Sequence, residues 1–472
     1  MSRRAFALAA LACSLLLAGC GVNHHDIVAS TVISTPTNAE VPGGQTSPAD
    51  TKAITNVTVV VVDRLSSARV EGAIVTLGQH SATTDKDGIA TFRRLPHRGY
   101  IAEVAAKGYD TQRQRVRLRP SRRFAVVRVW RPGWSWPIYG GDAARTQSPP
   151  EITLKPHLRL RWGLKLDDLI EFPPVTAAGI GYVTTAKGTL TAFSTENGDV
   201  VWRRALHERM GASPGVADGR VFVVSFQGQI RAFDAFDGHL LWQKALGAAC
   251  ESSPQVVSGR LLFAASDGRV RALDPATGRR LWITDVGAKV TMGVTAVNGL
   301  AIVGDYDGNV HALDQRTGRQ RWQAGVGGQI YAGIAAQDGR LFVSSSTDKD
   351  LTALRLDNGR QIWQQSLHDF AFSGPAVAGN VVVAGSYDGH LRAFKATDGS
   401  LLWDVAMGGK IYGTPQIVRG VVWAASFAGN TYAIALGSGR RLQRFGHGRY
   451  AGTSGDARTL FLLGFSRIWG LR

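Results

Sequence analysis

The sequence contains little cysteine, which excludes a fold held together by disulfide bonds. Only three cysteines occur in 472 residues, and two of them, Cys13 and Cys20, lie in the apolar N-terminus. Cys250 is the one thiol of the remaining chain, so no internal disulfide can form there. Stability must come from packing, and a chain of this length can bury a core large enough to supply it.

Long amphipathic helices and metal-binding clusters are also missing. After the N-terminus no extended stretch repeats its apolar residues every 3.6 positions, whereas Val, Thr, Phe and Trp recur in short runs and glycine is abundant. This pattern predicts an all-β chain. The histidines are scattered singly apart from His24 and His25, so no metal-ligand spacing is present and we expect no metal site.

The N-terminus has the pattern of an export signal. Two arginines precede an apolar stretch that is too short to span a bilayer and that ends in Leu-Ala-Gly-Cys at Cys20. This ending resembles the lipobox of bacterial lipoproteins. The resemblance implies removal of residues 1–19 as a signal peptide, lipid attachment at Cys20 and anchoring to an extracytoplasmic membrane face, the outer membrane if the cell has one. An ordinary signal peptide or a short anchor is the alternative.

The next two segments differ in composition. Residues 20–53 are rich in Ser, Thr, Pro, Gly and Ala without apolar periodicity, so we expect a flexible tether after the lipid anchor. Residues 54–131 contain short β-like runs separated by turns such as Asp87-Gly88. With Gly72, Thr84 and Gly108 also in place, they resemble the carboxypeptidase regulatory-like (transthyretin-like) family, which implies a small β-sandwich.

Positive charge is concentrated in this second segment. Lys52 to Arg131 holds 16 Lys or Arg against 6 Asp or Glu, within a chain of net charge +18. Four arginines, Arg113, Arg115, Arg117 and Arg119, alternate along one predicted strand and would share one face of it. They are candidates for contact with anionic lipid or polymer, and the alternative is a solvated sheet face. No basic groove with interleaved aromatics predicts nucleic-acid binding.

Residues 132–154 form a linker rich in Trp and Pro, and a repeat fills residues 155–472. Short apolar runs end in tryptophan at intervals of 40 or 41 residues, at Trp162, Trp202, Trp242, Trp282, Trp322, Trp363 and Trp403. Two units, Ala272–Trp282 and Ala312–Trp322, fit the pattern AxDxxTGxxxW completely. This pattern resembles the tryptophan-docking motif of the PQQ-like (quinoprotein-type) β-propeller family, so each repeat is expected to be one four-stranded blade whose Trp packs on its neighbour.

The ends of the repeat region predict how the propeller closes. After Gln443, which stands where the next tryptophan would fall, the chain is long enough for only about three strands. Leu158–Trp162, by contrast, looks like the last strand of a repeat that has no beginning. We therefore expect these residues to pair with the C-terminal strands and complete an eighth blade, which removes an exposed sheet edge.

The resemblance also raises the question of catalysis, because some PQQ-like proteins bind pyrroloquinoline quinone and oxidise alcohols. Those enzymes share a vicinal cysteine disulfide, Ca²⁺ ligands and inserted loops. This chain has no adjacent cysteines, and its repeat steps leave no room for insertions. We therefore expect no enzyme, no catalytic residues and no cofactor. A PQQ-dependent quinoprotein oxidoreductase or a quinone-binding sensor is the alternative.

A binding surface is the remaining candidate site. Positions seven and nine residues after each tryptophan are expected at the start of the innermost strands, around the central channel. They include aromatics and isolated charges, a composition typical of protein contacts: Glu171, Arg209, Glu251, Lys289, Tyr331, Phe370, Phe372, Lys410, Tyr412 and Tyr450. The alternative is that they only fill the channel.

A lipobox followed by a PQQ-like propeller resembles the BamB family of outer-membrane assembly factors, which are non-enzymatic scaffold lipoproteins. The resemblance implies a monomer with protein partners in the cell envelope, held to the membrane through Cys20. The transthyretin-like segment is a departure from that arrangement. Surface adhesion through this basic segment is a further alternative.

Overall fold

The computed structural model describes residues 53–54, 56–96, 99–119, 121–149, 151–152, 154–449 and 452–472. The expected signal peptide, Cys20, the tether up to Lys52 and Tyr450 lie outside them. In the described residues the helical structure is one short 3₁₀ turn, η1 (Pro132–Trp134), and the other elements are strands. No helix there is both long enough and apolar enough to cross a bilayer.

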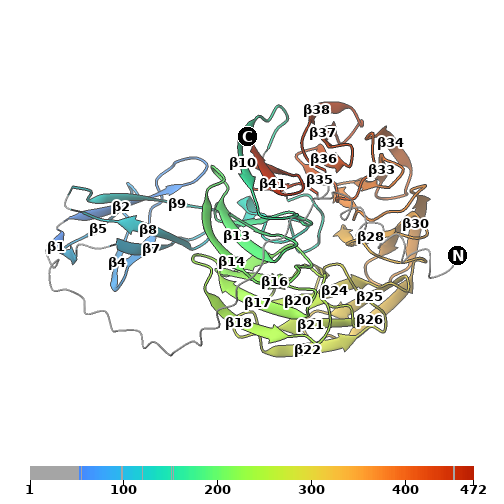
Figure 1. The fold of residues 1–472 in the computed structure, drawn as a ribbon, viewed down its shortest axis with the longest axis horizontal. Coiled ribbons are helices and arrows are strands. Elements are labelled where there is room, and N and C mark those ends of the chain that lie inside the picture. The colour runs from blue at the N-terminus through green and yellow to red at the C-terminus, as the bar shows by residue number, and fades with distance from the viewer. Residues whose placement is uncertain are drawn as a thin grey trace, which may run out of the picture. The chain divides into compact units, whose positions relative to one another are not determined.

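The part of the chain between Val57 and Val129 contains two sheets around one core (Figure 1). One sheet has the order β5 (Ile89–Phe92), β2 (Val57–Asp63), β9 (Phe124–Val129), and the other has the order β4 (His80–Thr83), β3 (Ile74–Leu77), β7 (Gly99–Ala105), β8 (Gln112–Arg117). A short pair joins β1 (Ala53–Ile54) to β6 (Leu95–Pro96). Alternate residues of β7 are buried, as a strand covered on one face requires.

The Asp-Gly turn of this segment is fixed by side chains that bond to the backbone. Thr84 Oγ1 accepts the N–H of Ala73 at 2.8 Å and donates to the carbonyl of Val70 at 2.7 Å. Asp85 Oδ1 accepts the N–H groups of Asp87 and Ile89. The turn residues therefore hold the β4 and β5 strands in place on either side of it.

Between residues 175 and 445 the chain forms four-stranded antiparallel sheets, one after another, each with its strands in sequence order. The innermost strands are β11 (Val175–Ala177), β15 (Gly215–Ala217), β19 (Gln255–Val257), β23 (Thr295–Val297), β27 (Ala335–Gln337), β31 (Ala376–Ala378) and β35 (Gln416–Val418). The second strands are β12 (Ile180–Thr184), β16 (Arg220–Val224), β20 (Arg260–Ala264), β24 (Leu300–Gly304), β28 (Arg340–Ser345), β32 (Val381–Gly385) and β36 (Val421–Ser426).

The third strands are β13 (Thr189–Ser194), β17 (Gln229–Asp234), β21 (Arg269–Leu273), β25 (Asn309–Asp314), β29 (Asp350–Arg355), β33 (His390–Lys395) and β37 (Asn430–Ala435). The outer strands are β14 (Val200–Ala205), β18 (Leu240–Ala245), β22 (Arg280–Asp285), β26 (Gln320–Gly325), β30 (Gln361–Ser366), β34 (Leu401–Ala406) and β38 (Arg441–Phe445). Second and third strands are buried on both faces, which explains their near-continuous apolar sequences.

The closing sheet joins the two ends of the repeat region. Its order is β10 (Leu160–Lys165), β41 (Arg467–Leu471), β40 (Leu460–Leu463), β39 (Ser454–Gly455). Trp162 pairs with Gly470, and the backbones of Arg159 and Arg472 exchange two hydrogen bonds of 2.8 and 3.0 Å. The predicted pairing of the segment around Trp162 with the C-terminal strands is confirmed.

Figure 1 shows these sheets arranged around a common centre. Most innermost strands lie beside the next one in sequence order, and β39 of the closing sheet lies beside β11. The structure is therefore all-β, with the repeated four-stranded sheets of a β-propeller.

Tryptophan at the end of each repeat packs on the next sheet. The indoles of six repeats each donate to a backbone carbonyl of the following sheet; Trp282, for example, donates to Gln315 at 3.1 Å. The turn glycine of that sheet lies against the ring, because a Cβ on Gly318 would come within 2.7 Å of Trp282. The aspartate of the motif holds the same turn: Asp314 Oδ1 accepts the N–H groups of Arg316 and Thr317.

Two departures from the repeat have structural counterparts. Gln443 replaces the tryptophan of its repeat, and its side-chain amide bonds to the closing segment instead: Oε1 accepts the N–H groups of His157 and Leu158, and Nε2 donates to the carbonyl of Leu158. Lys349 occupies the hairpin position where neighbouring units have glycine, and its backbone is in the left-handed region with φ of 65°.

Residues 134–147, within the segment 132–154 that was expected to be a linker, are built into the centre of the propeller. Carbonyls between Trp134 and Gln147 accept N–H groups from the innermost strands, or in one case from just after β39, in the order of the sheets. The donors are Ala457, Thr176, Val216, Ala296, Ala336, Val377 and Ile417, at 2.7 to 2.9 Å. The linker interpretation is corrected: this segment satisfies edge N–H groups that would otherwise lack partners.

Arg145 completes this central segment. Its side chain is 2% exposed, and it donates to the carbonyls of Val294 at 2.7 Å, Tyr139 at 2.5 Å and Ser253 at 3.1 Å. Burial lowers the pKa of the guanidinium to about 10. Arg145 thus crosslinks the central segment to the loops that lead into β19 and β23.

Candidate functional site

The candidate binding residues that the structure describes lie in the segments that lead from an outer strand to the next innermost strand. Tyr331, for example, follows the end of β26 at Gly325 and precedes β27, which begins at Ala335. The prediction that these positions begin the innermost strands is therefore wrong. The segment must cross the whole sheet, about 15 Å for four strands at their usual spacing, so several more residues are needed before the strand begins.

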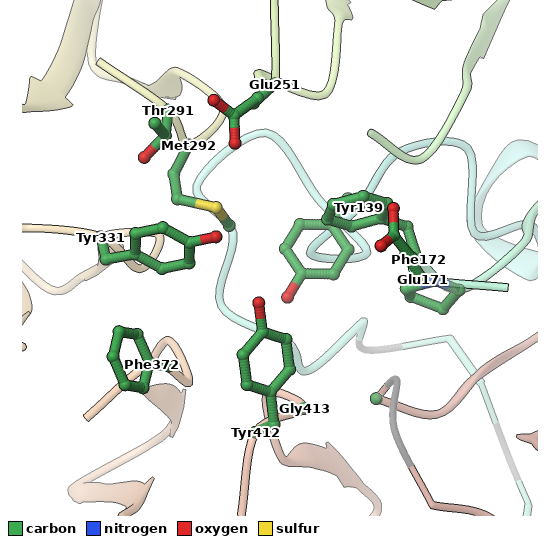
Figure 2. A pocket seen from close by; sticks show the side chains of 12 residues that line it. Tyr139, Glu171, Phe172, Glu251, Thr291, Met292, Tyr331, Phe372, Tyr412 and Gly413 are labelled. Carbon is green, nitrogen blue, oxygen red and sulfur yellow. The ribbon is translucent and has the colours of Figure 1, made fainter. Parts of the chain in front are cut away.

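The residues nine positions after each tryptophan nevertheless come together. They line one central pocket, to which Tyr139 and Met292 also contribute; the repeat positions are Glu171, Glu251, Thr291, Tyr331, Phe372 and Tyr412. Figure 2 shows the hydroxyls of Tyr139, Tyr331 and Tyr412 directed toward the middle of this central pocket, with Glu251 across from Tyr412. The repeat thus delivers one side chain to a shared site at six of the seven positions, and the seventh is Gly211.

Two of the residues seven positions after tryptophan pair with these glutamates. Arg209 lies 3.3 Å from Glu171, and Lys289 lies 3.3 Å from Glu251. The glutamates are mostly buried, at 14 and 17% side-chain exposure, whereas Arg209 and Lys289 are 54 and 39% exposed. Burial raises the pKa of Glu171, the pair with Arg209 opposes this, and the nearby charge of Glu251 adds to it.

A continuous group of half-buried rings extends from the pocket across neighbouring loops. We call it the aromatic face, and it comprises Tyr306, Tyr331, Phe370, Phe372, Tyr387, Tyr412 and Phe427. Phe372 lies at its centre, with ring centroids 4.9 Å from Tyr387, 5.3 Å from Tyr331 and 6.2 Å from Tyr412. Phe427 is 36% exposed and continues the group beyond Tyr412 at 6.4 Å.

Three members of this face were missed by the sequence reasoning. Tyr306, Tyr387 and Phe427 lie in hairpins between second and third strands, each 24 residues after a repeat tryptophan. Their backbone N–H groups donate to the carbonyls of Lys289, Phe370 and Lys410, which brings each hairpin against a candidate residue. An aromatic residue that recurs 24 positions after a repeat tryptophan was the sequence signal that could have identified these three residues.

Cations lie over several of these rings. Lys289 Nζ is 4.8 Å from the ring centre of Tyr306, Lys410 Nζ is 4.9 Å from that of Tyr387, and Lys349 Nζ is 5.2 Å from that of Phe370. Arg209 lies over Phe226 in the same way. These cations therefore help to hold the rings in place.

Tyr139 was missed because it belongs to the central segment and not to the repeat. Its hydroxyl hydrogen-bonds Thr414 Oγ1 at 2.8 Å, and burial raises its pKa. Backbone hydrogen bonds of the central segment place Tyr139 at the pocket. Because any residue type can form such bonds, the sequence does not reveal them.

Two nucleophilic side chains of the repeat region, Ser213 and Cys250, are buried. Ser213 Oγ donates to the carbonyl of Pro173 and is buried, while burial raises the pKa of the Cys250 thiol to about 12. Asp305 bonds His311 at 2.7 Å inside its hairpin. Among the described residues no group of three or more His, Cys, Asp or Glu is arranged to hold a metal.

The four alternating arginines at positions 113, 115, 117 and 119, here called the basic stripe, are not part of the lining of the central pocket. Arg113, Arg115 and Arg117 are exposed on β8, and Arg119 is exposed two residues beyond the end of the strand, so the four arginines share one exposed side but only three belong to the strand. Arg113 Nη1 bonds Asp234 at 2.9 Å, and both Arg113 and Arg115 lie over Phe236. Part of the stripe is therefore engaged within the chain.

Comparison with known proteins identifies relatives of the repeat region. Among solved structures, BamB from Moraxella catarrhalis matches with a TM-score of 0.59 at 18% identity, over 67% of this chain and 97% of that one. A quinohemoprotein alcohol dehydrogenase from Comamonas testosteroni matches with a TM-score of 0.63 at 14% identity, over 72 and 80% of the two chains. A europium-containing methanol dehydrogenase gives 0.62 at 14% identity, over 72 and 90%.

At these identities the structural matches establish the fold alone. A search of curated proteins finds no significant match. The family model described as outer membrane protein assembly factor BamB matches residues 159–306 and 306–410, more than half of the chain. On this match, the chain belongs to the PQQ-like repeat family described as outer membrane protein assembly factor BamB.

Proposed function

We propose that this chain is a non-catalytic scaffold of the cell envelope, anchored by lipid at Cys20, that binds a protein partner through the aromatic face. The observation that carries the proposal is the continuous group of half-buried rings centred on Phe372. Rigid aromatic side chains with polar edges are the groups that dominate protein interfaces. Membership of the BamB family supports a role in outer-membrane protein assembly.

The proposal includes a finer description of the architecture. The repeated sheets and the closing sheet count as eight blades of one closed propeller, and the preceding β-sandwich is a transthyretin-like module. The pairing of β10 with β41 supports closure by the N-terminal strand.

The structural likeness to quinoproteins requires a test of whether the pocket suits pyrroloquinoline quinone. That cofactor is an anion with several carboxylates, so its site needs positive charge. The described lining of the central pocket contains two carboxylates, Glu171 and Glu251, and no Lys or Arg. The lining residues therefore do not fit pyrroloquinoline quinone. This mismatch supports a non-catalytic function.

Titration with quinone addresses the competing enzyme function directly. Pyrroloquinoline quinone and Ca²⁺ are added to the purified chain while absorbance and dye reduction are followed. We expect neither stoichiometric uptake nor dye reduction with alcohols. Tight uptake with dye reduction would establish the oxidoreductase instead.

Crosslinking and affinity capture from native membranes test the scaffold. The wild-type chain is expected to retain an envelope protein that a Phe372→Ala, Tyr412→Ala variant loses by about tenfold or more, because central aromatics contribute most of the binding energy. Leu281→Ala, on the outer strand β22, is the control and should capture as much as wild type. Equal capture by the double variant would reject the aromatic face as the interface.

A further inference from the structure

The central pocket is locally acidic in a chain with a large positive charge. Glu171 and Glu251 are held mostly buried at its lining, and the charge of Glu251 raises the pKa of Glu171. Their partners Arg209 and Lys289 are more exposed than they are and stay 3.3 Å away. Each pair involves Oε1 of its glutamate, and a carboxylate can accept several hydrogen bonds, so both glutamates remain acceptors on the lining of the pocket.

The opposite side of the pocket consists of aromatic rings. Tyr331 and Phe372 meet edge to face at 5.3 Å, with the rings at 88°, and Phe372 and Tyr412 stack at 27°. In Figure 2 these three rings lie on the side of the pocket across from Glu251. Ring faces attract cations, and they do so more strongly where water is excluded.

Carboxylates on one side and aromatic rings on the other form a receptor for an organic cation. A guanidinium or ammonium group would bond the glutamates while its apolar stem packs on the rings. The hydroxyls of Tyr139 and Tyr331 could accept further hydrogen bonds from it. An anionic group would be repelled by the carboxylates, and a purely aliphatic group would exclude water from them without offering a hydrogen bond.

We propose that the central pocket receives one cationic side chain, arginine or lysine, that the protein partner presents to the aromatic face. This inference rests on the proposed scaffold function and gives it a chemical specificity: the partner carries an exposed basic residue within an apolar surface. The charge complementarity of the pocket selects this occupant.

Calorimetric titration of the full chain with short peptides tests the proposal. The probes are Gly-Gly-Arg-Gly-Gly amide, the same peptide with lysine, and a neutral matched peptide with citrulline. We expect at least one cationic peptide to bind about tenfold or more tightly than the citrulline peptide, a difference of about 1.4 kcal/mol. A Glu171→Gln, Glu251→Gln variant should lose this preference.

Asp307→Asn is the matched control, because it removes an exposed carboxylate beside Tyr306 that is not part of the pocket lining. It should retain the preference for the cationic peptide, and unchanged thermal unfolding of all variants shows that they fold. If no cationic peptide is preferred, or if CaCl₂ alone binds and depends on the two glutamates, the proposal is overturned.

Failure of the cationic-residue proposal can be distinguished from failure of the scaffold proposal. If the glutamine double variant still captures the envelope partner while the Phe372→Ala, Tyr412→Ala variant does not, the aromatic face stands and the cationic occupant is rejected. If neither variant affects capture, the scaffold proposal itself is rejected.

Discussion

Arg145 shows how one residue can organise the centre of a propeller. Its guanidinium is fully enclosed, yet its hydrogen-bond partners are three backbone carbonyls, without a direct ion pair to a carboxylate. These bonds join the central segment to two neighbouring loops. The sequence indicated none of this, because the carbonyls of Tyr139, Ser253 and Val294 are groups that any residues would supply.

Removal of this guanidinium should be costly. Arg145→Met removes one donor from each of three buried carbonyls, of which that of Val294 keeps Gln255 Nε2, and we expect the free energy of unfolding to fall by about 3 kcal/mol or more. Urea denaturation measures the change. The exposed Arg279→Met should stay within about 0.5 kcal/mol of wild type. A loss as small for Arg145→Met as for this control would show that the central segment does not depend on it.

Asp305 gives a pH dependence at the residue scale. Burial raises its pKa, but hydrogen bonds from His311 and from Asn309 outweigh burial, so the folded-state pKa lies below the ordinary value of 3.8. A lowered folded-state pKa contributes stability above pH 3.8 that is lost as pH falls through the lower value. Asp305→Asn should therefore flatten the fall in unfolding free energy below pH 4. An unchanged acid profile in this variant would contradict the assignment.

At the scale of elements, the tryptophan repeat determined most of the fold and part of the site. Its period predicted the four-stranded sheets and the small turn residues beside each indole, because a large ring needs a small neighbour. It did not predict where the crossing loops end and the innermost strands begin, since loop length is set by the width of the sheet. Tyr331 and Phe372 were found as candidates, but their hairpin partners Tyr306 and Tyr387 were not.

The docking of an indole on the next turn can be tested with two glycines of the same backbone conformation. Gly318 has φ of 76° and lies against Trp282, whereas Gly339 has φ of 73° and nothing within 4 Å of its Cβ position. Both alanine variants incur the cost of a positive φ, but only Gly318→Ala also overlaps the ring. We expect it to lower the unfolding free energy by at least about 1 kcal/mol more than Gly339→Ala does. Equal losses would mean that the docking contact contributes little.

For the whole molecule, the two ends of the repeat region complete one sheet. The incomplete first repeat and the short C-terminus together predicted this closure, because an open propeller would expose strand edges. The central segment was not predicted: residues 134–147 lack the repeat pattern, and their hydrogen bonds are formed by the backbone. The arrangement of the whole molecule could therefore be predicted from the sequence where side chains repeat. It could not be predicted where the backbone alone makes the contacts.

Closure can be weakened at one residue. A Cβ on Gly470 would overlap the ring of Trp162, whereas the nearest atom to a Cβ on Gly163 in the paired strand is 3.7 Å away. Gly470→Ala should lower the unfolding temperature by several degrees and favour self-association through the opened edge. Gly163→Ala should be close to wild type in thermal unfolding and in size-exclusion chromatography. A Gly470→Ala chain that stays monomeric and equally stable would contradict closure through this pair.

The central claim is that the aromatic face binds a protein of the cell envelope. Its most direct test is a photo-crosslinking amino acid placed at Phe427, on this face, or at Leu281, on the outer strand β22, in chains assembled in native membranes. We predict one dominant crosslinked protein from position 427. Position 281 should not crosslink to that protein. Crosslinks from position 281 alone, or the same products from both positions, would contradict it.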